Sequence, residues 1–256
     1  MESIGVIKEI YSRILPTDKE GLLNFIKCYK EDTRNGVLVL VKKAEDKINQ
    51  IEIECTRTKK MYSFEEKYIN MGHQYICGID EVGRGPLAGP VVASAVILPN
   101  DQYIMYLNDS KQLSEKKREE LYDIILEKCV AYGIGIISEE RIDEINILQA
   151  TYEAMRMAIQ NLKVKPDILL NDAVKIPDVD IKQVPIIKGD TLSASIAAAS
   201  IVAKVTRDRM MEQYDTLYPG YDFANNKGYG SKKHIEGIKQ SGPCAIHRKT
   251  FITKFV

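Results

Sequence analysis

The chain has 256 residues, of which 45% are apolar and 28% are charged, enough for one large domain, or a domain with a small appendage, to form a hydrophobic core. Its formal net charge of zero argues against a protein that coats nucleic acid through bulk positive charge. No apolar run reaches the roughly 18 residues of a membrane span, and the N-terminus does not read as a secretion signal. Five scattered cysteines without a C-x-x-C pair argue against a disulfide framework or a structural zinc site. We therefore expect a cytoplasmic protein with no membrane association.

Residues 1–72 are expected to form a helical N-terminal extension, because they show helical apolar spacing and carry no chemical motif. This spacing recurs over residues 2–14 and 18–30. A longer helix is expected over residues 35–57, where one stripe spaced by four and three residues contains Val37, Val41, Ala44, Ile48, Ile51 and Cys55. A short helix over 63–68 is expected to begin with Ser63 as its N-cap and Glu66 as the capping-box partner.

Residues 73–256 alternate between strand and helix patterns, which predicts an α/β domain with a central sheet and helices on its faces. The expected strands cover residues 75–80, 90–98, 131–137, 167–172 and 185–190. The expected helices cover residues 115–129, with Ser114 as N-cap, 147–162 and 192–214. The last of these helices contains an apolar run over residues 196–203, so we expect it to be buried.

Carboxylates end three of the expected strands, at Asp80-Glu81, Asp172 and Asp190. Functional sites gather at strand ends in α/β sheets, and converging carboxylates repel each other unless cations lie between them. Such oxygen ligands suit Mg²⁺ or Mn²⁺, and two ions of this kind can promote phosphodiester hydrolysis. The alternative is that these acids simply face water. Because neighbours on a strand point to opposite faces, Asp80 and Glu81 can share a site only if the chain turns there.

A glycine-rich segment, Gly83-Arg84-Gly85-Pro86-Leu87-Ala88-Gly89-Pro90, directly follows the first acid pair. Its backbone can approach a sugar or phosphate closely, although a simple hairpin turn would have a similar composition. It matches neither a Walker loop nor a dinucleotide fingerprint. Further along, residues 200–256 contain ten Lys or Arg against five Asp or Glu, a net charge of +5. This stretch is either a phosphate-facing surface or a solvated face.

An ordered set of motifs between residues 76 and 249 resembles the ribonuclease HII family. Each motif is moderately specific, and their order and gaps make the set highly specific. The segments that carry the resemblance are Gly78–Val92, Asn108–Ser114, Ile187–Asp190, Ser200–Arg209, Lys227–Gly230 and His247–Phe251.

The resemblance implies a ribonuclease-H-like fold, with a central mixed sheet flanked by helices, and an endonuclease of DNA replication and repair. Separately, we expect the protein to be a monomer. The implied reaction is hydrolysis on the 5′ side of a ribonucleotide in RNA/DNA hybrids and in DNA with embedded ribonucleotides. It leaves 3′-hydroxyl and 5′-phosphate ends and depends on two Mg²⁺ or Mn²⁺ ions. The implied catalytic and metal-binding acids are those at the strand ends, namely Asp80, Glu81, Asp172 and Asp190. One departure is that the third acid stands in Asn171-Asp172-Ala173, whereas the family usually has Val-Asp, often followed by Gly.

The resemblance also implies a set of substrate-binding residues. Gly83, Arg84 and Gly85 would read the 2′-hydroxyl, the group that separates RNA from DNA locally. Tyr229 would pack on the deoxyribose beyond the scissile junction. The candidates for phosphate contacts are Lys111, Lys204 and Arg207, with Ser110 and Ser200 as further donors. We expect His247-Arg248 to support the fold or contact nucleic acid, without a catalytic role.

Three alternatives remain at this point. The sister enzyme ribonuclease HIII has its last acid shortly after the third and a sheet-bearing N-terminal module, whereas this chain has Ile176 nearby and a helical extension. A non-catalytic binder of RNA/DNA hybrids would not need four clustered acids. Another nuclease or recombinase on the same fold would give no reason for the glycine-rich segment and Tyr229 to occur together.

Overall fold

The computed structural model describes residues 2–256, and the chain divides into two compact units, Met1–Lys59 and Lys60–Val256. The first unit is formed by α1 (Ile4–Arg13), α2 (Lys19–Tyr29) and most of α3 (Asn35–Met61). The expected long helix is therefore confirmed. Its buried stripe includes Val37, Val41, Ala44 and Ile51, which pack with Ile7, Leu22 and Phe25.

The short helix α4 (Ser63–Asn70) differs from expectation at its start. Tyr62 occupies the N-cap position and makes no side-chain cap, so the prediction of a capping box at Ser63 is wrong. Instead, buried Glu65 accepts hydrogen bonds from the hydroxyls of Ser193 and Ser195, both at 2.6 Å, and from the Ser195 N–H at 2.9 Å. These bonds place α4 within the larger unit, whereas the sequence pattern predicted it as part of the extension ending at residue 72.

The larger unit is built on a mixed sheet of five strands in the order β3-β2-β1-β4-β5. The strands are β1 (Ile76–Val82), β2 (Val91–Ile97), β3 (Ala131–Ile137), β4 (Ile168–Asp172) and β5 (Lys182–Ile186). β2 pairs antiparallel with both β1 and β3, while β4 pairs parallel with both β1 and β5. The predicted α/β fold with a mixed sheet is thus confirmed.

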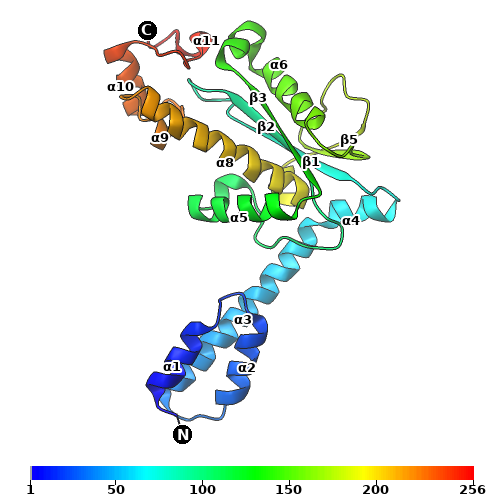
Figure 1. Cartoon of the computed structure of the whole chain (residues 1–256), viewed down its shortest axis with the longest axis vertical. Helices are drawn as coiled ribbons and strands as arrows, with labels where there is room; N and C mark the ends of the chain where they lie inside the picture. Colours follow the sequence, from blue (N-terminus) through cyan, green and yellow to red (C-terminus); the bar gives the residue numbers. More distant parts are fainter. Residues whose placement is uncertain (1) are drawn as a thin grey trace. The chain divides into compact units, whose positions relative to one another are not determined.

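Helices cover both faces of this sheet (Figure 1). On one face lies α8 (Ala194–Leu217), whose small apolar residues pack with α5 (Glu115–Lys128) against β1 and β2. On the other lies α6 (Glu139–Gln160), against β2 and β3. Gly78 of β1 lets α8 approach closely, because a Cβ there would collide with the backbone of Ser195. The prediction of a buried helix at this position is confirmed.

Two expected elements differ in their bounds. α6 begins at Glu139, capped by Ser138, and kinks at Asn146 (φ 68°), so the sequence reveals only the part after the kink. The last strand, β5, ends at Ile186 and does not reach Asp190 as expected. Lys188 adopts a left-handed conformation (φ 58°) and starts the short helix α7 (Gly189–Leu192), which carries Asp190.

Short elements complete the larger unit. They are η1 (Ser110–Gln112), α9 (Phe223–Asn226), α10 (Lys232–Ser241) and α11 (Lys249–Ile252). Buried residues of these C-terminal segments form a separate small core with Ala88 and Met211. Within residues 2–256, no helix is long and apolar enough to cross a membrane.

Candidate active site

Asp80 and Asp172 lie at the same level on neighbouring parallel strands. β1 and β4 pair with Ile79 opposite Asn171, so the next residue on each strand is one of these acids. Asp80 is buried and accepts a hydrogen bond from the Ser200 hydroxyl on α8. The sheet register therefore brings together two of the predicted acids.

Glu81 stays within β1, paired opposite Ala93 of β2, and the chain turns only after Val82. Its carboxylate accepts a hydrogen bond from Arg84 at 3.2 Å. The charge of Glu81 nevertheless acts on both Asp80 and Asp172. The predicted turn between Asp80 and Glu81 is therefore absent, and the two acids lie close together without it.

Asp190 reaches the other acids from α7. The N–H of Gly189 donates to Asp172 Oδ1 at 2.7 Å, which fixes the start of α7 beside the end of β4. The charges of Asp190 and Asp172 act on each other directly. The expectation of a strand end at Asp190 is wrong, because the chain leaves β5 through the left-handed Lys188 before this acid.

The acids are coupled in a way that disfavours their charged forms. Burial raises the pKa of Asp80 well above its ordinary value, and the charges of Glu81 and Asp172 raise it further. Burial also raises the pKa of Glu81, although Arg84 opposes this effect. Burial and the charge of Asp172 raise the pKa of Asp190. A cation between these carboxylates would relieve both the burial cost and the mutual repulsion.

The chemistry of these donors fits a hard divalent cation, since every candidate ligand is a carboxylate oxygen. In the conformation described for residues 2–256, no three Asp, Glu, His or Cys side chains converge closely enough to hold a metal ion. In this conformation Arg84 donates to Glu81, and the Gly189 N–H donates to Asp172.

The glycine loop (residues 83–90) is hydrogen-bonded, on its side facing the protein interior, by two fully buried arginines. Arg248 donates to the carbonyls of Gly83, Arg84, Pro86 and Gly89 at 2.6–3.1 Å. Arg207 donates to the carbonyls of Pro90, Ala88 and Lys227 at 2.8–3.0 Å. Gly83 has φ 94°, and a Cβ there would collide with Arg207. The loop is therefore a preorganised backbone surface.

Of the roles that the sequence predicted for the two arginines, one is confirmed and one is wrong. The expected support of the fold by Arg248 is confirmed. The expected phosphate contact by Arg207 is wrong, because its side chain is fully buried and its donors are engaged by carbonyls. Burial lowers the pKa of Arg207 to about 10 and that of Arg248 to about 9, which reflects the cost of placing cations inside the protein.

Tyr229 stands beside the glycine loop with an exposed ring. Its side chain is 45% exposed, and a Cβ added at Gly85 would lie 3.7 Å from Cε1 of the ring. Leu87 N–H donates to the carbonyl of Gly228 at 2.8 Å, which ties the loop to the segment that carries the tyrosine. The structure thus brings together Tyr229 and Gly85, which lie far apart in the sequence.

Lys111, on η1, provides positive charge near the acids. Burial lowers the pKa of its ammonium, but the charges of Asp109, Asp80 and Asp190 outweigh that effect and raise the pKa overall. In the same region, the Ser110 hydroxyl lies 2.9 Å from that of Ser200. Lys111 is therefore placed to neutralise negative charge at the edge of the acid cluster, defined as Asp80, Glu81, Asp172 and Asp190.

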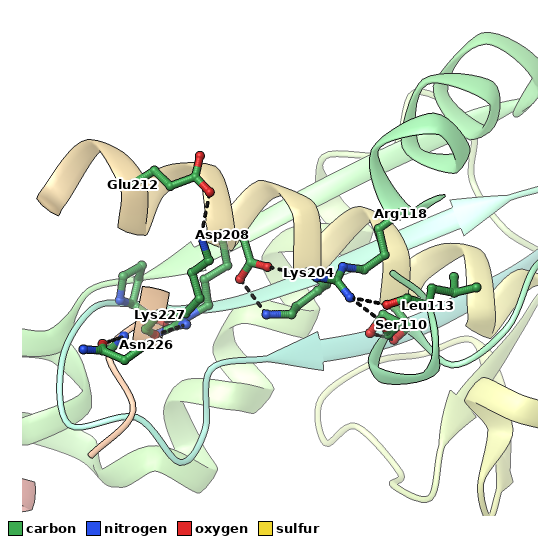
Figure 2. Close-up of polar contacts among 12 residues, drawn as sticks. Ser110, Leu113, Arg118, Lys204, Asp208, Glu212, Asn226 and Lys227 are labelled. Atoms are coloured by element: carbon green, nitrogen blue, oxygen red, sulfur yellow. Dashed lines mark hydrogen bonds and ion pairs between the residues drawn. The ribbon is translucent and has the colours of Figure 1, made fainter. Parts of the chain in front are cut away.

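Lys204 does not present a free ammonium (Figure 2). Its Nζ lies 2.6 Å from Asp208 Oδ1, and Arg118 approaches the other oxygen of the same carboxylate at 3.9 Å. Arg118 in turn donates to the carbonyls of Ser110 and Leu113. Lys204 thus belongs to an ion network on α8 that includes Asp208, a residue the sequence analysis did not single out.

The comparisons with known proteins cover nearly the whole chain. The model of the family described as Ribonuclease HII matches residues 77–254, and that of the Ribonuclease HII N-terminal domain matches residues 3–69. The chain is 58% identical over 246 residues to a ribonuclease HII of Lachnoclostridium phytofermentans, covering 96% of each protein. It is 53% identical over 250 residues to a ribonuclease HII of Enterococcus faecalis, covering 98% of this chain and 96% of that protein.

Solved structures show the same fold over most of the chain. The ribonuclease H2 from Pyrococcus horikoshii matches 69% of this chain and 93% of its own, with 27% identity and a TM-score of 0.55. A PCNA:RNase HII complex from Archaeoglobus fulgidus contains a chain that matches 68% of this one and 94% of its own, with 27% identity and a TM-score of 0.57.

Proposed function

The chain belongs to the ribonuclease HII family and is an endoribonuclease, and on this premise we propose the bond that it cuts and the residues that act. It hydrolyses the phosphodiester on the 5′ side of a ribonucleotide, in RNA/DNA hybrids and in DNA with embedded ribonucleotides. The products carry 3′-hydroxyl and 5′-phosphate ends. The observation that supports this most directly is the position of the Tyr229 ring next to Gly85, in the loop whose Arg84 donates a hydrogen bond to Glu81.

Asp80, Glu81, Asp172 and Asp190 are the proposed catalytic acids and ligands of Mg²⁺ or Mn²⁺. When bound at such carboxylates, a pair of these ions supplies an activated water and stabilises the leaving oxygen. The protein contributes by holding Asp80 and Asp172 in register and by fixing α7 through the Gly189 N–H. Lys111 faces Asp80 and Asp190 and would attract the substrate phosphate to this edge of the cluster.

The glycine loop provides the proposed recognition of the ribonucleotide. Because Arg207 and Arg248 engage the loop carbonyls from inside the protein, the backbone around Gly83, Arg84 and Gly85 keeps one conformation. A preorganised backbone can read the 2′-hydroxyl without paying an ordering cost at binding. The Tyr229 ring can then pack on the next sugar, which lacks that hydroxyl. Together the two features would select an RNA-to-DNA junction.

Lys204 remains a proposed phosphate contact. When substrate binds, its ammonium would share its hydrogen bonds between Asp208 and a phosphate oxygen.

We also propose that the enzyme acts as a cytoplasmic monomer in DNA replication and repair. All five cysteines are free thiols, as a reducing compartment would maintain them. Light scattering after size exclusion would test the oligomeric state.

The test of the function is cleavage of a labelled DNA duplex that carries one ribonucleotide, in Mg²⁺, in Mn²⁺ and in chelator. An all-DNA duplex and a duplex with four consecutive ribonucleotides serve as controls. We expect a metal-dependent cut on the 5′ side of the single ribonucleotide, with a 3′-hydroxyl end. Cleavage of the four-ribonucleotide duplex alone would reject the junction specificity, and binding without cleavage would reject the catalytic proposal.

A further inference from the structure

Two buried histidines form a direct ring-to-ring contact in the C-terminal part of the larger unit. His234 lies on α10 and is fully buried, and His247, in the segment before α11, is 3% exposed. Their Nε2 atoms are 3.0 Å apart. Two of the three histidines in the chain are therefore paired, and both are buried.

The surrounding backbone fixes the direction of the protons in this pair. The N–H of Cys244 donates to His247 Nδ1 at 2.9 Å, so this nitrogen is an acceptor and the ring proton is on Nε2. That proton points to Nε2 of His234, which must then carry its own proton on Nδ1. His234 Nδ1 lies 2.9 Å from the carbonyl oxygen of Tyr229, which is a suitable acceptor. One pair of neutral tautomers satisfies all three hydrogen bonds.

Aromatic side chains keep this pair in an apolar environment. Tyr221 packs on His247 with ring centroids 4.9 Å apart, and Phe223 packs on His234 at 5.1 Å. Burial lowers the pKa of both histidines. The pair is therefore a neutral, directional link within a rigid core.

The two ends of this link belong to the two halves of the proposed sugar site. One end is the carbonyl of Tyr229, whose ring lies beside Gly85. The other end is the segment 244–248, which bridges to Ala88, accepts from the Gly89 N–H through the Ile246 carbonyl, and carries the Arg248 clamp. A change in the histidine pair would alter the position of the tyrosine relative to the glycine loop.

We propose that His234 and His247 are positioning residues that set the Tyr229 ring opposite Gly85 and so determine how strongly the enzyme prefers a ribonucleotide–deoxyribonucleotide junction. This inference rests on the proposed function, in which the ring packs on the deoxyribose beyond the junction. The histidines themselves touch no substrate. They act through the backbone of Tyr229. Its carbonyl carbon is bonded to the Cα atom that carries its side chain, so the position of the carbonyl affects the position of the ring.

The test compares kcat and KM on two substrates, a DNA duplex with one ribonucleotide and a continuous RNA/DNA hybrid. The preference is the ratio of the two kcat/KM values. We expect Tyr229→Ala and His234→Leu each to lower this preference by roughly tenfold, since small displacements of a positioning group have effects of this order or larger. The double variant should lose no more than Tyr229→Ala alone, because both changes remove the same placement of the ring. His234→Asn keeps an amide donor near Nδ1 and should restore most of the preference.

A purely structural role would give a different pattern. In that case His234→Leu would lower activity on both substrates equally, or its effect would add fully to that of Tyr229→Ala, and either result would overturn the proposal. Tyr132→Ala, at an exposed tyrosine on the edge strand β3, is the matched control and should leave the preference unchanged.

A second measurement applies even where His234→Leu does not fold. In ¹⁵N-histidine NMR spectra of the unmodified protein near neutral pH, His234 should carry its proton on Nδ1 and His247 on Nε2. The opposite tautomers, or a charged ring, would overturn the link. Failure of the unmodified enzyme to cut the single-ribonucleotide duplex would instead reject the proposed function. If that enzyme cuts and Tyr229→Ala matters but His234→Leu does not, the positioning inference alone is rejected.

Discussion

Replacement of Arg248 by methionine should destabilise the larger unit and disorder the glycine loop. The guanidinium is fully buried and donates five hydrogen bonds to four backbone carbonyls. Methionine has a similar length and no donor, so these carbonyls would lose their partners. At about 1 kcal/mol for each carbonyl, the lower end of the cost of an unsatisfied buried group, the loss is about 4 kcal/mol. For a unit of this size, that corresponds to a fall in Tm of roughly 8–16 °C.

The assay is thermal unfolding followed by circular dichroism, together with kcat/KM on the single-ribonucleotide duplex below the lower Tm. Arg248→Lys keeps a charge but places its donors on one atom, so we expect an intermediate loss. Arg209→Met is the matched control, because Arg209 is a partly exposed residue paired with Glu119 and should contribute no more than about 1 kcal/mol. If the free energy of unfolding of Arg248→Met lies within about 1 kcal/mol of that of the unmodified protein, the carbonyls do not depend on the guanidinium and the reasoning fails.

Three further predictions concern other parts of the larger unit. Asp80→Asn should abolish cleavage with little loss of substrate binding in a gel-shift assay. The control Asp101→Asn, at an exposed acid, should stay active. Substantial cleavage by Asp80→Asn would show that Asp80 is not a catalytic residue. Burial lowers the pKa of His247 to about 4, so its contribution to stability is complete above about pH 6.5 and is lost as the pH falls through 4, because the unfolded chain binds the proton first. His247→Gln should flatten this part of a plot of Tm against pH, and an unchanged slope would count against it. Glu65→Leu should cost on the order of 2 kcal/mol because Ser193 and Ser195 lose their acceptor, whereas Glu65→Gln keeps one oxygen and should cost less; equal Tm values for the two variants would contradict this.

Periodic apolar patterns predicted the long elements of the fold well. The apolar stripe on α3 fits one face of a helix, and the apolar run on α8 fits a helix that is buried all round. Few other conformations would bury these residues. The start of α6 was missed because the kink at Asn146 interrupts the periodicity. Asp190 was placed on a strand because the residue that ends the extended chain in a left-handed conformation is Lys188, and a non-glycine residue gives no sign of such a conformation in the sequence.

The proposed site residues that carry recognisable chemistry could be selected from the sequence, whereas residues whose role depends on burial and long-range contacts could not. The proposed acids stand out in the sequence because each follows an apolar run. Arg207 carries no such mark, since an isolated arginine usually lies on the surface. Its burial depends on carbonyls of Ala88 and Pro90, more than a hundred residues earlier in the chain. Hydrogen bonds between such distant segments leave no local pattern from which they could be inferred.

The arginine clamp also has a consequence for the timing of synthesis. Gly83 and Arg248, which are hydrogen-bonded in the folded protein, are 165 residues apart in the chain. At roughly 5–20 residues per second, the ribosome needs on the order of ten to thirty seconds to join them. During that interval the acids of β1 already exist, but the loop beside them has neither buried arginine until Arg207 is made and only one of the two until Arg248 follows. A nascent chain that ends before Arg248 would therefore lack part of the support on which the proposed recognition of a ribonucleotide depends.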